Sequence, residues 1–186
     1  MNSIFKLLLV LFLVLKATQT YSQDKFHVHV DYNYLLGLYE KGDFWTIKSD
    51  LNGFDVNIAG MYDFNERLSA GIGIGAEKLN TPEYTIFPVF AKVAYSPIRS
   101  TEKPYVFTRL GYGIGTKISN PGFLFNPGIG YKLMLRKHFG FNFMLGYHCQ
   151  SVRYDIVVYN DEGAIAAKRT GLNSRHSLSF GIGFIF

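Results

Sequence analysis

Four side chains in the last quarter of the sequence have the types that nucleophilic catalysis requires. They are His148, Ser151, His176 and Ser177. A serine attacks only when a base lies within hydrogen-bonding distance of its hydroxyl group. His176 and Ser177 are adjacent, so in a strand their side chains point to opposite faces. Gln150 occupies the position at which a His-x-Ser pair starting from His148 would need its serine. The spacing therefore disfavours a catalytic pair.

Two other histidines have the spacing of metal ligands. His27 and His29 are separated by one residue, so in a strand both imidazoles project from the same face, about 7 Å apart. Asp31 is the only acidic side chain near enough to complete a site, and a metal centre normally needs more ligands than this. We therefore interpret these histidines as a polar strand face and expect neither a metal nor another cofactor.

A glycine-rich segment at 71–76 fits the G-x-G-x-x-A pattern of dinucleotide sites. Such a site requires a strand before the glycines and a helix after them, so that backbone amides point at the phosphates. The alternation of apolar and small residues instead continues straight through the segment. These glycines therefore indicate small side chains on one face of a strand.

Strands must position these groups, because apolar residues recur at every second position and no stretch after residue 23 has a sustained helical period. The pattern occupies eight segments: 26–34, 54–62, 68–75, 87–95, 106–114, 125–133, 139–147 and 178–186. Their second face consists mostly of glycine, serine, asparagine, histidine and charged residues, which cannot fill an apolar core. The sequence predicts an all-β fold, an eight-stranded antiparallel up-and-down transmembrane β-barrel with its apolar face outward. A soluble periplasmic barrel or sandwich is the alternative.

Composition limits the function classes. The chain has 186 residues, 48% of them hydrophobic, which is enough for one domain with a core. The net charge of +5 is too small and too dispersed to indicate nucleic acid binding. Cys149 is the single cysteine, which excludes an intramolecular disulfide and a zinc site built on several thiolates.

The first residues have the pattern of a secretory signal peptide. Lys6 precedes an unbroken apolar run at 7–15, which is too short to span a bilayer as a helix. Thr20 and Ser22 are small residues suited to cleavage before Gln23. We predict a signal peptide at 1–22 and a barrel domain at 23–186, with a retained membrane anchor as the alternative.

The lengths of the connections predict the orientation of the barrel. Segments 63–67, 96–103 and 136–138 are short, whereas 38–52 and 151–173 are long. Outer-membrane barrels have short periplasmic turns and longer outer loops. With an even number of strands, both termini are expected on the periplasmic side.

Charged residues on the polar face divide along the chain into acids and then bases. They are Asp31, Asp55 and Glu77, followed by Lys92, Arg109 and Lys132. We expect them to form an ion-pair network inside the barrel, with Asp31 and Arg109 paired at similar depth. Because an eight-stranded barrel is only wide enough for side chains to fill it, these charges are expected to plug the interior. A narrow channel for small solutes is the alternative.

The long loops hold the interaction candidates, which are apolar side chains outside the predicted strands. They are Phe44, Trp45, Val152, Tyr154, Ile156 and Val158. The last four belong to a predicted hairpin that turns at 160–163 and either folds over the barrel mouth or offers an edge to a partner. Four basic residues are candidates for contact with lipopolysaccharide phosphates: Arg153, Lys168, Arg169 and Arg175.

The final segment, 178–186, ends on phenylalanine and has apolar residues at Phe180, Ile182, Phe184 and Phe186. It resembles the C-terminal signal by which bacterial outer-membrane barrels are recognised for insertion.

Several further segments extend this likeness to residues 24–186. They are the glycine strands at 71–75 and 111–115, the turn at 62–68, and segment 88–95 followed by 103–105. Together these segments resemble the outer-membrane protein β-barrel domain family, small eight-stranded barrels that include PorT-type proteins. The resemblance implies a multi-pass barrel in the bacterial outer membrane, surrounded by membrane lipid and lipopolysaccharide and inserted by the barrel-assembly machinery. It implies no shared catalytic residues.

We therefore expect a non-enzymatic barrel with a structural, adhesive or assembly role, which engages an extracellular or envelope protein through its outer loops. Two other functions stay open. One is a lipid A acyl-modifying enzyme, because some eight-stranded barrels use serine and histidine near the outer leaflet for that chemistry. The other is the narrow solute channel.

Overall fold

The computed structural model describes residues 25–43, 46–47, 50–80, 83–99, 103–115, 120–136, 139–159 and 165–186. Within these ranges, residues 47, 84, 121, 154–159 and 165–169 are described by their backbone. The predicted signal peptide at 1–22 and the candidates Phe44 and Trp45 lie outside the described residues.

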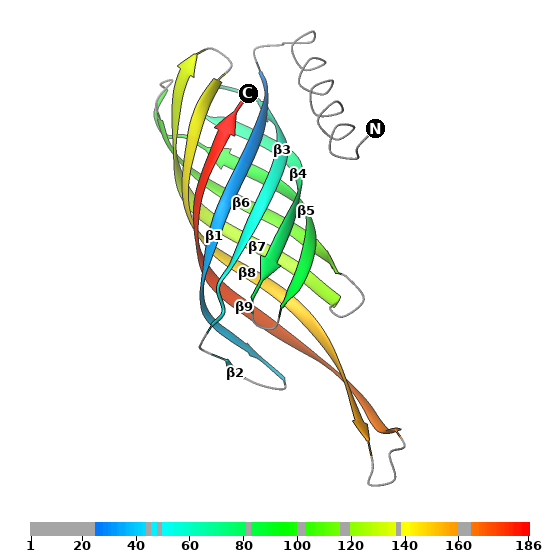
Figure 1. The fold of residues 1–186 in the computed structure, drawn as a ribbon. Coiled ribbons are helices and arrows are strands. Elements are labelled where there is room, and N and C mark those ends of the chain that lie inside the picture. The colour runs from blue at the N-terminus through cyan, green and yellow to red at the C-terminus, as the bar shows by residue number, and fades with distance from the viewer. Residues whose placement is uncertain are drawn as a thin grey trace, which may run out of the picture.

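The described residues form eight long strands and one short one (Figure 1). The strands are β1 (Phe26–Gly42), β2 (Thr46–Ile47), β3 (Gly53–Asp63), β4 (Leu68–Leu79), β5 (Tyr84–Tyr95), β6 (Lys103–Gly115), β7 (Asn120–Arg136), β8 (Phe139–Tyr159) and β9 (Ile165–Ile185). All pairings are antiparallel, and apart from β2, which only pairs with β1, each long strand pairs with the next along the chain. The pairing of β1 with β9 closes the barrel. The predicted fold class is confirmed.

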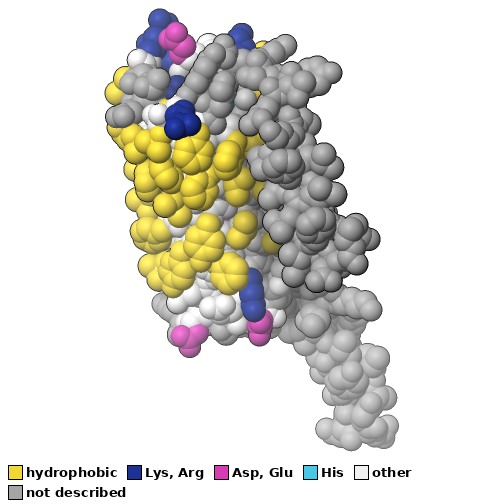
Figure 2. Space-filling model, turned by 45° about the horizontal axis from the view of Figure 1, so that its top comes forward, with side chains coloured by type: hydrophobic (Ala, Val, Ile, Leu, Met, Phe, Trp, Pro, Cys, Tyr) yellow, Lys and Arg dark blue, Asp and Glu magenta, His cyan; other side chains and the backbone are white. Residues whose placement is uncertain are grey.

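The alternation seen in the sequence sorts side chains to the two faces of the barrel wall. Large apolar side chains point outward, where Ile72 and Ile74 are 75% and 61% exposed. Figure 2 shows them as a band, with charged side chains toward the two ends of the molecule. Polar side chains such as Asp31 and Asn126 point inward and are buried. This arrangement is the reverse of a water-soluble protein and is typical of a barrel surrounded by lipid. No helix in the described part of the chain is long and apolar enough to cross a membrane.

Apolar side chains also occupy parts of the interior. Leu35, Leu79, Ile86 and Val152 form a buried cluster near the end of the barrel that carries the long loops. Val152 is fully buried, so its expected place on an outer interaction surface is wrong. The expectation assumed that the strand changes phase near residue 150, but β8 keeps its even-numbered side chains inward through Val152.

Strands β8 and β9 are much longer than the sequence pattern indicated. Each has 21 residues, and their mutual pairing continues to Tyr159 and Ile165. The alternation is weak in the outer half of β9, where residues 168–177 are mostly polar, so hydrophobic periodicity marked the strand only from 178 onward.

Candidate functional site

An ion pair joins β1 to β5 inside the barrel. The Nζ atom of Lys92 lies 3.0 Å from Oδ2 of Asp31. The Asn142 side-chain amide donates to the other Asp31 carboxylate oxygen at 3.1 Å, and the Tyr105 hydroxyl donates to Asn142. Lys132 completes this group, because its Nζ atom lies 5.4 Å from the centroid of the Tyr105 ring.

A second ion pair lies further along the interior. The Arg109 guanidinium is 3.5 Å from Oδ2 of Asp55 and donates from Nε to Asn126 at 2.8 Å. The side-chain amides of Asn33 and Asn57 donate to the other oxygen of Asp55. The carboxylate therefore has partners on both oxygens, which is what a buried charge requires.

The predicted pair between Asp31 and Arg109 is wrong. The expectation counted residues from the start of each strand. It assumed that residues with similar counts lie at the same depth in the barrel. In the structure, Asp31 lies opposite Asn57 and Asp55 opposite Asn33, so the two acids are two positions apart along the wall. Barrel strands are tilted and staggered, and this shift brings Asp55 to Arg109 and leaves Asp31 to Lys92.

A third group of charges lies near the long-loop end. His148 Nε2 is 3.3 Å from Oε1 of Glu77, and Arg175 is 3.8 Å from Glu40. Asn173 donates to Glu40 at 3.0 Å. All six charges predicted for the interior lie there, but the sequence analysis missed Glu40 and Arg175. Extending the alternation of β9 backward from residue 178 places residue 175 inside, a signal that was present and not used.

Arg175 therefore cannot contact lipopolysaccharide as expected, because it is 1% exposed within the barrel. Arg153 is exposed on the outer face of β8. Tyr154, Ile156, Val158, Lys168 and Arg169 belong to the residues described by their backbone.

The candidate catalytic groups lie on both faces of the barrel wall, with His148 and Ser177 inside and Ser151 and His176 outside. His148 and Ser177 are paired neighbours on β8 and β9 inside the barrel, and the buried Ser177 hydroxyl has no hydrogen-bond partner among the described residues. His176 points outward, where its Nδ1 atom lies 2.6 Å from the Tyr147 hydroxyl. The Tyr39 ring stacks on it at a centroid distance of 4.4 Å. The outward histidine is thus held by tyrosines.

The two histidines considered as metal ligands lie beside different side chains in the structure. His27 Nε2 is 3.1 Å from the Asp63 carboxylate. His29 is buried in the interior near Lys92 and Lys132. Among the described residues, no three histidine, cysteine or acidic side chains gather closely enough to hold a metal ion.

The last strand is joined to the first along the seam of the barrel. Backbone groups of Val28 and Phe186 exchange two hydrogen bonds of 2.8 and 2.9 Å. The side chains of Phe180, Ile182, Phe184 and Phe186 all point outward. Their predicted role in recognition for insertion stays a prediction.

Comparison with known proteins places the fold. No family model matches the chain, and no curated protein matches it in sequence. The crystal structure of Neisserial surface protein A, NspA, has a TM-score of 0.51 and 14% identity, over 84% of this chain and 95% of that one. The crystal structure of the outer membrane protein OprG from Pseudomonas aeruginosa has a TM-score of 0.51 and 11% identity, over 87% and 96%. The fold is that of the small outer-membrane β-barrels.

Proposed function

We propose that the chain resides in the bacterial outer membrane as a non-enzymatic barrel, and that its filled barrel anchors a projecting hairpin that binds a protein partner outside the membrane. The outer half of β8 and β9 forms this hairpin. The short turns and both termini then lie on the periplasmic side.

The unequal length of the strand pairings carries the proposal. β7 pairs with β8 up to Asn120 and Arg153, and β1 pairs with β9 up to Gly42 and Asn173. β8 and β9 continue together to Tyr159 and Ile165, so the hairpin extends past the barrel by about 20 Å (Figure 1). It projects away from the barrel rather than folding over its mouth.

The projecting hairpin has two strand edges that no described strand pairs with. Free edges present unpaired backbone N–H and C=O groups, to which an extended segment of another protein adds as a further strand. A partner that binds in this way needs no pocket, which suits a thin element held away from the barrel wall.

The membrane location is supported by the outer surface. Apolar side chains such as Val89 and Leu110 are 49% and 45% exposed and belong to a band that follows the wall. A band of this extent in water would drive aggregation, whereas lipid covers it without cost.

The interior and the histidines support a role without catalysis or conduction. Buried ion pairs and apolar clusters occupy the described interior, and an eight-stranded barrel is only wide enough for side chains to fill it. His148 and Ser177 share the inner face and are enclosed away from the lipid, whereas the outward His176, on the same face as Ser151 and Ser174, has its Nδ1 atom engaged by the Tyr147 hydroxyl.

A truncated barrel tests the proposal. Asp155 and Thr170 face each other in the ladder, so an Asn-Gly turn replacing residues 156–169 closes the hairpin at that pair. We expect this variant to keep the faster migration of unheated protein on a denaturing gel, because the barrel itself is unchanged. Loss of the heat-dependent shift would show that the hairpin is part of the barrel's stability.

Partner binding is tested in living cells with a photo-crosslinking residue at Val157. We expect a discrete adduct with another protein after illumination. The same residue at Ile72, on the lipid-facing side of β4, is the control and should give no protein adduct. Absence of an adduct at 157, or equal adducts at both positions, would contradict the interaction role.

A further inference from the structure

The outward face of β1, β9 and β8 changes character at the upper edge of the apolar band, where upper means nearer the long-loop end of the barrel. Two cross-strand rows of polar and aromatic side chains form a ledge there: Tyr39, His176 and Cys149 in the lower row, and Lys41, Ser174 and Ser151 in the upper row. All six are partly or fully exposed, whereas the residues that alternate with them point into the barrel. The ledge therefore faces the level at which lipid headgroups meet hydrocarbon.

Aromatic contacts fix the lower row. The Tyr39 ring stacks on the His176 ring at 4.4 Å, and the Tyr147 hydroxyl lies 2.6 Å from His176 Nδ1. Rings with an apolar body and a polar tip are favoured at a membrane interface. These contacts hold the three rings together at the edge of the apolar band.

The upper part of the ledge carries positive charge. The Lys41 side chain is exposed, and the exposed Arg153 lies on β8 one row further out, opposite Leu172. The neighbouring carboxylate of Asp43 accepts a hydrogen bond from the Leu172 backbone N–H at 2.9 Å. Glu40, the other acid at this end of β1, points into the barrel. Two cations and two serine hydroxyls suit a phosphate group.

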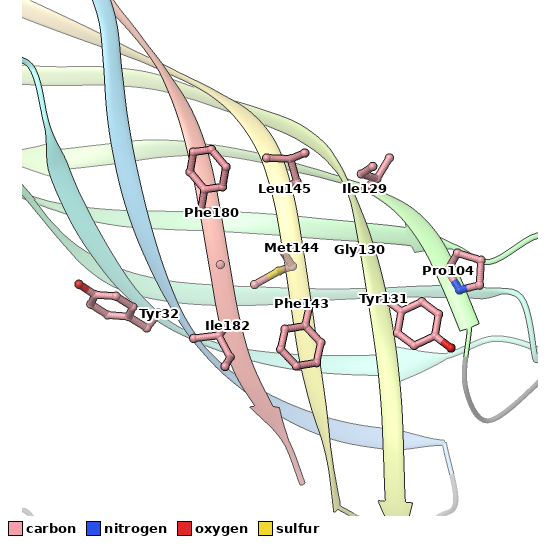
Figure 3. Close-up of a pocket in the computed structure, with 11 residues that line it drawn as sticks. Tyr32, Pro104, Ile129, Gly130, Tyr131, Phe143, Met144, Leu145, Phe180 and Ile182 are labelled. Atoms are coloured by element: carbon pink, nitrogen blue, oxygen red, sulfur yellow. The ribbon is translucent and has the colours of Figure 1, made fainter.

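An apolar hollow lies below the ledge on the same strands (Figure 3). Its upper wall is the row Ile129, Leu145 and Phe180, and its lower wall is the row Tyr131, Phe143, Ile182 and Tyr32. Gly130 and Gly181 lie between the walls and form part of the floor of the hollow, since a side chain at either position would point into the barrel interior. Phe180 is four residues from His176 along β9, or about 13 Å.

We propose that the ledge and the hollow together bind one anionic lipid of the outer leaflet. The phosphate group of a glycolipid lies between Lys41 and Arg153, and one acyl chain descends into the hollow. This inference rests on the proposed location in the outer membrane. Lipid tails surround the whole band, so the hollow contributes only a shape that fits an acyl chain. The preference for an anionic lipid comes from the two cations.

Native mass spectrometry of the folded barrel in an uncharged detergent tests headgroup selection. The probes are a diphosphorylated lipid A, the same lipid without phosphates, and inorganic phosphate. We expect one diphosphorylated lipid per barrel, with the dephosphorylated form bound at least about tenfold more weakly. Equal binding of the two lipids would overturn the proposal. Competition by inorganic phosphate at the same concentration as the lipid would also overturn it, because the ledge would then be a site for free anions.

Substitution locates the site. Lys41→Gln combined with Arg153→Gln should weaken binding of the diphosphorylated lipid about tenfold or more. Lys78→Gln is the matched control, since Lys78 lies at the same end of the barrel on β4, where it pairs with Glu83. Equal weakening by the control would show that general positive charge attracts the lipid, and no ledge site exists.

The hollow has its own pair of variants. Ile182→Trp fills it, and Ile72→Trp adds the same ring to the outer face of β4. We expect only the first to weaken lipid binding, with the preference for phosphate retained; equal effects would remove the hollow from the site. Heat-dependent migration is measured for every variant. A barrel that inserts in the outer membrane without lipid selectivity refutes this inference alone, whereas a protein absent from that membrane refutes the proposed function.

Discussion

The Nζ atom of Lys92 lies 3.0 Å from Oδ2 of Asp31 inside the barrel, where the two side chains are 1% and 3% exposed. The contact joins β5 to β1 across the interior. Asn142 holds the second carboxylate oxygen, so the ion pair is enclosed by polar partners from a third strand. Removal of one member leaves the other charge buried without its counter-charge, which is far more costly than removal of both.

The first prediction concerns this pair. Lys92→Met should lower the free energy of unfolding by about 3–5 kcal/mol, because Asp31 then lacks its counter-charge in the interior. Urea titration of the barrel in phospholipid vesicles measures the change, with the heat-shifted gel band as the readout for unfolding. Lys78→Met is the control: its ion pair with Glu83 is exposed, so its loss should leave the free energy of unfolding nearly unchanged.

The double variant Asp31→Asn with Lys92→Met should recover much of the lost stability, because no uncompensated charge remains. Equal destabilisation by Lys92→Met and Lys78→Met would contradict the assignment of a buried pair.

A double-mutant cycle tests which acid partners Arg109. Arg109→Gln and Asp55→Asn remove the two sides of a 3.5 Å contact, so their effects on the free energy of unfolding should be coupled by about 0.5–3 kcal/mol. The cycle with Asp31→Asn in place of Asp55→Asn should give a smaller coupling energy. A larger coupling between Asp31 and Arg109 would restore the pairing that the sequence suggested.

The contrast between these two pairs shows what alternation can and cannot predict. Period-two patterning sorted Asp31 and Arg109 to the interior, because a strand residue has only two faces to choose from. Which side chains meet across a barrel depends on tilt and stagger, and these are set by hydrogen-bond register around the whole wall. No local pattern in the sequence reports that quantity.

The ends of the strands were harder to predict from the sequence than their middles, both for the fold and for the site. Alternation identified β9 from residue 178 because the apolar side chains of Phe180 and Ile182 lie on the exposed outer face. Above that level the outward residues are Ser174 and His176, whose surroundings no longer demand an apolar side chain, so the pattern disappears while the strand continues. The ledge was missed for a different reason: its residues come from three strands and come together only through register.

A third prediction uses two glycines with different surroundings. A methyl group at Gly183 would collide with the Asp31 carboxylate, whereas one at Gly122 meets the Ser151 side chain at an ordinary 3.5 Å. Gly183→Ala should therefore lower the free energy of unfolding by about 1–3 kcal/mol. Gly122→Ala should leave it within about 0.5 kcal/mol of the parent. Urea titration in vesicles compares them, and similar values for both variants would mean that Asp31 can move aside freely.

The last prediction concerns conduction. Purified barrel inserted in planar lipid bilayers should give no single-channel steps, because a buried cluster of Leu35, Leu79, Ile86 and Val152 and the buried ion pairs lie inside a barrel that is only wide enough for side chains. A large open porin in the same bilayers is the positive control for insertion and recording. Steady steps from this chain would contradict a filled interior. If those steps also changed with Arg109→Gln, the current would pass the Asp55 pair, and the barrel would be a channel rather than an anchor.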